Sequence, residues 1–226
     1  MNQLFVKGII SEFIGIISSG KESNVYLAYN QDEEPVLIKI YKIDSQNTKW
    51  MKNYIIGDPR FKKIGTSTNK IIYTWCRKEF KNLSQMYRKQ IRVPRPIYAI
   101  DNVLVMEFLG THEGTPAPRL KDVGEIPDPK GMLDQILLGI KRMYLDAHLV
   151  HADLSEFNIL FYNSEPYFID VSQAVSIFHL NSPLYLERDV KNILTFFERY
   201  LDTNEMPPIN EFVGEILASQ ENQDAK

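Results

Sequence analysis

Runs of apolar residues predict a small antiparallel sheet in the first part of the chain. Stretches rich in β-branched and aromatic residues cover positions 13–17, 24–29 and 35–41, with turn-forming residues around them. Two further runs, 97–100 and 103–108, are so close together that they predict a hairpin.

Helical periodicity governs most of the remaining chain. Apolar residues recur there at intervals of three and four, which places them on one face of each predicted helix. The predicted elements are helices over 70–90, 132–148, 189–201 and 210–219, and short strands at 159–161 and 167–169.

Residues 42–69 show neither the apolar runs of a strand nor the periodicity of a helix. The segment is polar and contains Gly57, Pro59 and Gly65. A stretch of that length without a pattern predicts a functional or disordered loop, so we expect it to be mobile.

These elements predict an α+β fold with two lobes, like that of a protein kinase. Residues 1–109 form an N-lobe with an antiparallel sheet and a helix, and residues 110–226 form a mainly helical C-lobe. The start of the second part, 110–129, is rich in Gly and Pro and predicts a linker. This layout is typical of two-lobed phosphotransferases.

Composition indicates a globular protein without a membrane segment. The 226 residues are 44% hydrophobic and 24% charged, and no apolar run approaches the roughly 18 residues that a spanning helix needs. The first residues lack the pattern of a signal peptide. The one cysteine, Cys76, has no partner for an internal disulfide, which favours a reducing cytoplasmic location.

Charge is unevenly distributed. Residues 42–95 hold 14 Lys or Arg and 3 acidic residues, a net charge of +11, although the whole chain carries −3. Such a segment predicts either a basic face that meets a phosphate backbone or an ordinary lysine-rich surface in water.

The stretch GIISSGKES, residues 15–23, has three interpretations. Gly15 and Gly20-Lys21 have the spacing of a Walker A loop, but Glu22 stands where that loop needs Ser or Thr, and a strand follows instead of a helix. A kinase Gly-rich loop lies between two strands, and here Gly20 and Val25 keep its pattern. An ordinary hairpin turn fits the residues as well.

The sequence LVHADLSEFNILFY, residues 149–162, carries the clearest chemistry. It matches the kinase catalytic loop H-R-D-L-x-x-x-N at every position except Ala152. In that loop the aspartate, here Asp153, accepts the proton of the substrate hydroxyl, and the asparagine, here Asn158, holds Mg²⁺. Asp170 follows twelve residues after Asn158, at the end of a predicted strand, where a kinase keeps its second metal ligand.

Two charged residues occupy positions where the pattern predicts burial. Lys39 lies inside an apolar strand, and Glu79 lies on the apolar stripe of the 70–90 helix. A buried charge needs an opposite partner, so we expect these two to form the lysine–glutamate pair of a kinase. In the alternative, Glu79 borders the stripe and reaches water.

The motifs together resemble the RIO family of atypical protein kinases, in particular a compact, archaeal-type member of the RIO-one branch. The resemblance spans roughly residues 8–201. It rests on SSGKESNVY (18–26), IKIYK (38–42), GDPRF (57–61), RKEFKNL (77–83), VPRPI (93–97), NVLVMEFLG (102–110), PAPRLKDV (116–123), HADLSEFN (151–158), IDVSQAV (169–175) and RDVKNILTFF (188–197).

The resemblance implies the role of each site residue. Asp153 would be the catalytic base, and Asn158 and Asp170 would bind Mg²⁺ or Mn²⁺. Lys39, oriented by Glu79, would hold the phosphates of ATP. Asp170 would also be the site of an aspartyl-phosphate. Further residues would contact the nucleotide: Ser18, Gly20, Lys21, Glu22 and Ser23 at the phosphates, Met106, Glu107 and Leu109 at adenine, and in addition Val25.

The resemblance also implies a function, with alternatives. The first is an ATP-dependent serine/threonine kinase that phosphorylates itself and acts in maturation of the small ribosomal subunit, with the 42–95 segment on rRNA. The second is an ATPase whose cycle drives release from the pre-ribosome. The third, a scaffold without catalysis, would not need Lys39, Asp153, Asn158 and Asp170 together. Two features depart from a standard kinase: Ala152, and the absence of an A-P-E motif after Asp170. The stretch that follows Asp170 is also short, so we expect little chain to be available for a peptide-substrate platform.

Overall fold

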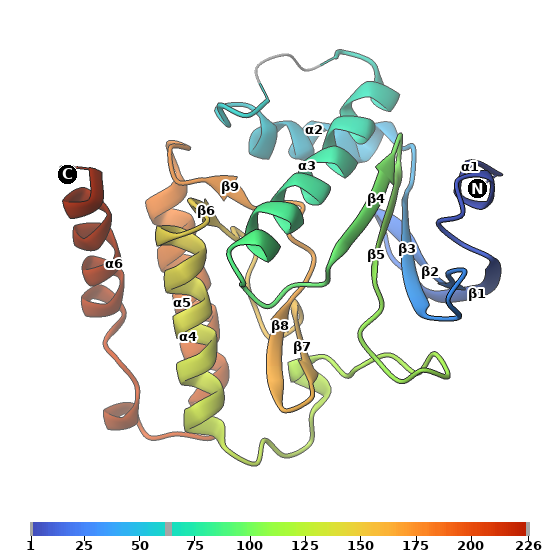
Figure 1. Cartoon of the computed structure of the whole chain (residues 1–226). Coiled ribbons are helices and arrows are strands. Elements are labelled where there is room, and N and C mark those ends of the chain that lie inside the picture. The colour runs from blue at the N-terminus through green and yellow to red at the C-terminus, as the bar shows by residue number, and fades with distance from the viewer. Residues whose placement is uncertain (1, 62–64, 225–226) are drawn as a thin grey trace.

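The computed structural model describes residues 2–61 and 65–224. Five strands form one antiparallel sheet in the order β1-β2-β3-β5-β4 (Figure 1). The prediction of an antiparallel sheet is confirmed, and the bounds of β3 are those expected. The strands are β1 (Glu12–Ser19), β2 (Ser23–Tyr29), β3 (Pro35–Tyr41), β4 (Pro96–Ile100) and β5 (Val103–Glu107).

Helix α3 (Thr68–Arg88) lies between the sheet and the helices of the C-terminal part (Figure 1). The side chain of Ser67 accepts a hydrogen bond from the amide of Lys70 and so caps the helix. Its apolar face is buried, while Arg77, Lys81 and Arg88 are exposed. A short helix, α1 (Asn2–Val6), precedes the sheet.

The prediction that 42–69 has no regular structure is wrong for part of that segment. Residues Ser45–Ile55 form helix α2, and Asp44 caps its first turn. Thr48, Met51 and Ile55 are buried on one face, and Trp50 packs edge-on against Trp75 of α3, with ring centroids 5.2 Å apart. The buried face of this helix is narrow and the residues beside it are polar, so the sequence showed no clear helical period here. Residues 62–64 lie outside the described residues.

The C-terminal part is mainly helical, as predicted, and pairs four short strands. Helix α5 begins at Ser182, earlier than the predicted 189. Pro183 lies in its first turn, where a proline is compatible with a helix because its missing N–H would have no partner there. The elements are α4 (Pro129–Leu145), β6 (Leu149–Val150), β7 (Ile159–Tyr162), β8 (Glu165–Phe168), β9 (Val175–Ser176), α5 (Ser182–Phe197) and α6 (Ile209–Asp224), with 3₁₀ turns at Leu120–Asp122 and Thr203–Glu205.

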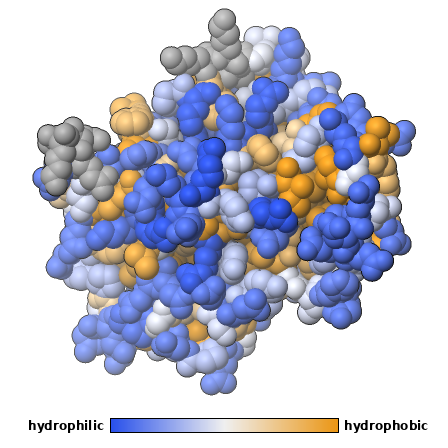
Figure 2. Space-filling model, viewed as in Figure 1, coloured by the Kyte–Doolittle hydropathy of each residue, from blue (hydrophilic) through white to orange (hydrophobic). Residues whose placement is uncertain are grey.

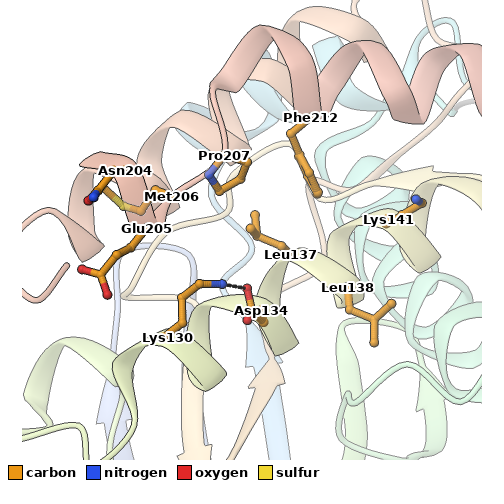
Figure 3. A pocket seen from close by; sticks show the side chains of 10 residues that line it. All are labelled: Lys130, Asp134, Leu137, Leu138, Lys141, Asn204, Glu205, Met206, Pro207 and Phe212. Atoms are coloured by element: carbon orange, nitrogen blue, oxygen red, sulfur yellow. Dashed lines mark hydrogen bonds and ion pairs between the residues drawn. The ribbon is translucent and has the colours of Figure 1, made fainter. Parts of the chain in front are cut away.

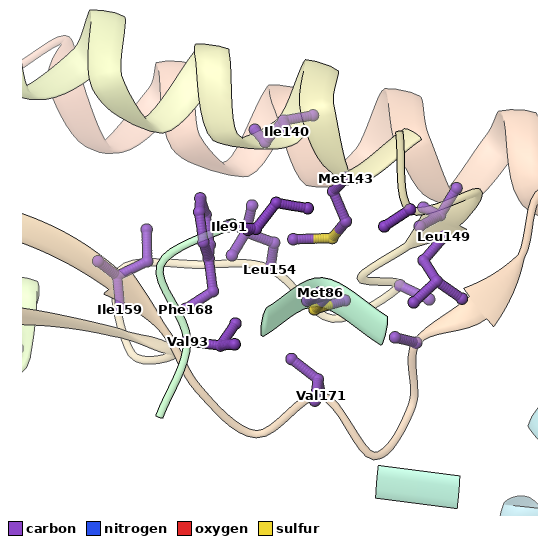
Figure 4. Packing of buried hydrophobic residues seen from close by; sticks show 14 of the residues in the cluster. Met86, Ile91, Val93, Ile140, Met143, Leu149, Leu154, Ile159, Phe168 and Val171 are labelled. Atoms are coloured by element: carbon purple, nitrogen blue, oxygen red, sulfur yellow. The ribbon is translucent and has the colours of Figure 1, made fainter. Parts of the chain in front are cut away.

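One continuous hydrophobic cluster joins the two parts. It contains Met86 of α3, Met143 of α4 and Phe168 of β8, all of which Figure 4 shows together. Leu120 and Ile126, in the segment predicted to be a linker, belong to the same cluster. Helix α3 is therefore anchored to the C-terminal part as well as to the sheet. The division into lobes at residue 110 stays a prediction.

Outside the core, hydrophilic residues cover most of the face shown in Figure 2. Among the described residues no helix combines the length and the apolar character that crossing a membrane requires.

Candidate functional site

A cavity of about 470 Å³ lies between the sheet and the C-terminal part, within the size range of small-ligand sites. Its lining combines apolar side chains of β2, β3 and the segment after β5 with charged groups, among them Lys39, Glu79 and Asp170. The sequence-predicted residues that line it are Ser18, Gly20, Ser23, Val25, Lys39, Glu79, Met106, Glu107, Leu109 and Asp170. Lys21, Glu22, Asp153 and Asn158 are not among its lining residues.

Lys39 and Glu79 form the predicted pair. Lys39 Nζ lies 2.9 Å from Glu79 Oε1, and their side chains are 9% and 1% exposed. The hydroxyl of Tyr41 donates a hydrogen bond to the other oxygen, Oε2. Burial raises the pKa of Glu79, and the ammonium of Lys39 acts against that rise. The glutamate is thus held on both oxygens by buried partners.

Lys39 also reaches Asp170, with Nζ 2.8 Å from Oδ1. Burial alone would favour the neutral amine, but Asp170 and Glu79 outweigh it and raise the pKa of Lys39. Burial likewise opposes the charge of Asp170, and Lys39 reverses this and lowers the pKa of that carboxyl. Both groups are therefore charged at neutral pH, and the Asp170 side chain is 48% exposed.

The catalytic-loop residues lie next to each other after β6. The side-chain amide of Asn158 donates to the backbone carbonyl of Asp153 over 2.8 Å, and Gln173 Nε2 donates to Asp153 Oδ2 over the same distance. Partial burial and the nearby carboxylate of Asp170 raise the pKa of Asp153. A raised pKa makes a carboxylate a better proton acceptor.

Helix α5 fixes the backbone of this loop. The amides of Ala152 and Leu154 donate to the two carboxylate oxygens of Asp189, over 2.7 and 2.9 Å. The guanidinium of Arg188 donates to the carbonyl of Ala152, a residue with φ of +65°. Asp153 is thus carried by a loop that α5 holds on both sides.

The glycine-containing stretch forms the turn between β1 and β2, which excludes the Walker A interpretation because no helix follows it. Gly20 N–H donates to Ser23 O over 2.9 Å, and Lys42 Nζ reaches Gly20 O at 2.6 Å. Lys21 is exposed. Burial and the carboxylate of Asp170 raise the pKa of Glu22 to about 7.

The segment after β5 contributes Phe108 and Leu109 to the lining of the cavity. The Glu107 N–H donates to Arg95 O over 2.8 Å, and the Leu109 carbonyl accepts from Ala117 N–H over 2.9 Å. Neither of these two hydrogen bonds uses the N–H of Leu109. Met106, a predicted adenine contact, also lines this cavity, and so does Val25.

Asn158 and Asp170 fit a magnesium ion by the chemistry of their donors. Each offers a side-chain oxygen, and Mg²⁺ prefers oxygen ligands. The residues that the structure describes include no cluster of three or more His, Cys, Asp or Glu that would hold a metal by themselves. This matches a site in which one or two protein oxygens share the ion with nucleotide phosphates.

Several residues that hold the site in place were not predicted from the sequence: Tyr41, Lys78, Asn82, Gln173 and Asp189. Lys78, Asn82 and Asp189 are polar side chains at buried positions of amphipathic helices. That signal identified Glu79 and could have identified these three as well.

A different cavity, of about 480 Å³, lies between α4 and the segment that leads into α6 (Figure 3). Its Lys130 points to Asp134 and pairs with it. It contains none of the predicted site residues, so the chemistry belongs to the cavity beside Lys39.

Comparison with known proteins gives the same assignment as the motifs. The family model described as the RIO domain matches residues 24–208. The RIO-type serine/threonine-protein kinase Rio1 of Haloferax volcanii is 40% identical over 87% of this chain and 67% of its own length. Its counterpart in Thermoplasma acidophilum is 41% identical over 79% of this chain and 92% of its own. The human serine/threonine-protein kinase RIO1 is 39% identical over 99% of this chain, which spans 40% of that protein.

A solved structure of the Rio2 kinase of Chaetomium thermophilum, described as an ADP/Mg²⁺-phosphoaspartate complex, matches with a TM-score of 0.69 and 25% identity. The match covers 94% of this chain and 64% of the other. The two-lobed kinase-like fold is thereby confirmed. On the family match and the identity to its relatives, this chain belongs to the RIO family of serine/threonine-protein kinases.

Proposed function

We propose that this chain binds ATP with Mg²⁺ and transfers the γ-phosphoryl group to a serine or threonine hydroxyl, including one of its own. The observation that supports this best is the position of Lys39. Its ammonium contacts Glu79 and Asp170 at once, and all three residues line a cavity that also has apolar side chains in its wall. Apolar side chains suit an adenine ring, and an ammonium suits phosphate oxygens.

Each site residue then has a defined task. Lys39 holds phosphate oxygens, and Glu79 with Tyr41 fixes the position of Lys39. Asn158 and Asp170 hold the metal ion, which would neutralise phosphate charge when bound. The turn containing Ser18, Gly20, Lys21, Glu22 and Ser23 covers the phosphates, and the backbone of Glu107 and Leu109 binds adenine.

Asp153 acts as the base. It accepts the proton of the acceptor hydroxyl while that oxygen bonds to the γ-phosphorus and the bond from phosphorus to the β–γ bridging oxygen breaks, which leaves ADP. Its contact with Asn158 places this base next to a proposed metal ligand. The raised pKa of Asp153 supports this role.

A second candidate is an ATPase whose turnover passes through Asp170. The description of the Chaetomium Rio2 complex names a phosphoaspartate in that protein. Here Asp170 combines a lowered pKa with a half-exposed side chain, so its carboxylate is both charged and accessible. In this reaction the carboxylate would bond to the γ-phosphorus while the bond from phosphorus to the β–γ bridging oxygen breaks and ADP leaves. Water would then hydrolyse the aspartyl-phosphate, which releases phosphate and restores the carboxylate.

The proposed partner is the pre-ribosomal small subunit, bound through its rRNA by the basic 42–95 segment. The exposed residues Lys70, Arg77, Lys81 and Arg88 of α3 support this, because the only acidic residue of that helix, Glu79, is buried. A cytoplasmic location is proposed from the free, buried thiol of Cys76.

Incubation with [γ-³²P]ATP and Mg²⁺ tests the proposal and separates its two forms. Label that stays on serine or threonine and survives acid supports the kinase. Label that is lost in mild base, with steady release of phosphate, supports the aspartyl-phosphate ATPase. Absence of both label and phosphate release, with nucleotide bound, would contradict both.

A further inference from the structure

Lys78 is a buried lysine that none of the proposed catalytic roles uses. It lies on α3 beside Glu79, and its residue is fully buried. Its Nζ donates to the backbone carbonyls of Ser172, over 2.8 Å, and of Ala174. A lysine is found inside a protein only when hydrogen bonds compensate for the lost water, so these two contacts account for its position.

Asn82, one helical turn further along α3, holds the same segment. Its Nδ2 donates to the carbonyl of Val171 over 2.7 Å and to that of Ala174 over 3.0 Å. Residues 171–174, here called the 171–174 turn, therefore have three carbonyls bound by two side chains of one helix. The amide of Ala174 closes the turn on the carbonyl of Val171, over 3.2 Å.

The 171–174 turn directly follows Asp170 and is hydrogen-bonded to its side chain. Ser172 Oγ donates to Asp170 Oδ1 over 3.1 Å, and the same serine offers its carbonyl to Lys78. Asp170 has φ of +57°, a left-handed conformation that non-glycine residues keep only when the surrounding structure holds them. The hydrogen bond from Ser172 and the ion pair with Lys39 both hold its side chain here.

We propose that Lys78 and Asn82 are positioning residues that set Asp170 for metal-bound nucleotide. The inference rests on the proposed function. Helix α3 carries Glu79 between them, and Glu79 fixes Lys39. One rigid helix thus places both the phosphate-binding lysine and the metal-binding aspartate, so the two move together with α3.

The chemistry of a buried amine agrees with this role. Burial lowers the pKa of Lys78 well below its usual range. The ammonium has three N–H donors and the neutral amine has two, so either form can serve both carbonyls that Lys78 contacts.

The test is the effect of magnesium on ADP affinity, measured by calorimetry with EDTA and with saturating Mg²⁺. Lys78→Met keeps the length of the side chain and removes its donors. We expect metal-free ADP affinity to stay within about twofold and the gain from Mg²⁺ to fall about tenfold or more, as for other partners of metal ligands. Lys191→Met is the control, because Lys191 is exposed on α5 and has no role in the proposed nucleotide, metal or RNA sites. It should behave as wild type.

Amide hydrogen exchange without nucleotide gives a readout that does not depend on metal. Lys78→Met should speed exchange in peptides that cover 170–176 and leave β1–β3 unchanged. Ser172→Ala removes only the hydroxyl between the turn and Asp170, and serves if Lys78→Met does not fold. It should also reduce the gain from Mg²⁺.

The outcomes separate this inference from the proposed function. If wild-type protein shows no gain in ADP affinity with Mg²⁺, the proposed metal site is wrong. If the wild type shows the gain and folded Lys78→Met and Ser172→Ala both keep it in full, the proposed function stands and the positioning role is overturned.

Discussion

Lys39 Nζ lies 2.9 Å from Glu79 and 2.8 Å from Asp170, residues 40 and 131 positions away in the sequence. An ammonium has three N–H donors, so these two contacts leave one for a phosphate oxygen. The lysine is thus already oriented by two carboxylates before nucleotide binds.

Replacing Lys39 with Met should destabilise the fold as well as stop turnover. Glu79 would keep only Tyr41 as a partner, and breaking a buried ion pair costs about 3–5 kcal/mol. Urea denaturation measures the free energy of unfolding. The double variant Lys39→Met with Glu79→Gln should recover part of that free energy and none of the turnover. A single variant as stable as wild type would show that the pair is not buried in solution.

Tyr41→Phe removes one hydroxyl and leaves the ring in place. Because that hydroxyl donates to a buried carboxylate, we expect a loss of about 1.5–3 kcal/mol in the free energy of unfolding. Turnover should fall while metal-free ATP affinity changes little, since Tyr41 acts through Glu79. Tyr26→Phe is a control in β2, where the hydroxyl meets only Asn24. Equal effects of the two substitutions would argue against a special role for Tyr41.

His151 should make stability depend on pH. Its side chain is buried, and burial lowers the pKa of the imidazole from 6.5 to about 4. The unfolded chain then binds a proton that the folded chain does not, so this contribution is present above pH 6.5 and is lost as pH falls toward 4. The shift corresponds to about 3 kcal/mol. Denaturation of wild type and of His151→Gln between pH 7 and 4 should show a steeper loss for wild type; parallel curves would contradict the assignment.

RNA affinity should fall steeply with salt if the basic face of α3 binds phosphates. Each phosphate contact to single-stranded RNA contributes about 0.7 to the slope of log K against log salt. Lys81→Glu should lower that slope, whereas Lys191→Glu, an equal change of charge on an exposed residue of α5, should not. A slope near zero in wild type would leave the segment as ordinary surface.

Sequence patterns predicted those features that depend on residues near one another in the chain. Strand β3 has one charged residue in an apolar run, and its bounds and the burial of Lys39 both followed from that pattern. The short spacing between Asp153 and Asn158 placed them on one loop, because five residues leave little freedom.

Features that depend on distant residues could not be predicted. Helix α2 buries only Thr48, Met51 and Ile55, and its packing on Trp75 becomes visible only in the fold. The hydrogen bond that Ala152 N–H donates to Asp189 spans 37 residues, and the one that Lys78 donates to the Ser172 carbonyl spans 94. Each partner alone looks like an ordinary polar residue of a helix or loop.

The central claim is that Asp153 takes a proton from an acceptor hydroxyl at a nucleotide held by other residues. The direct test compares wild type with Asp153→Ala for transfer of ³²P from ATP to protein and, separately, for ATP affinity. We expect transfer to fall by about 10²–10⁴-fold, the usual contribution of a general base, with affinity within about twofold. Transfer at the wild-type rate in the folded variant would contradict the account.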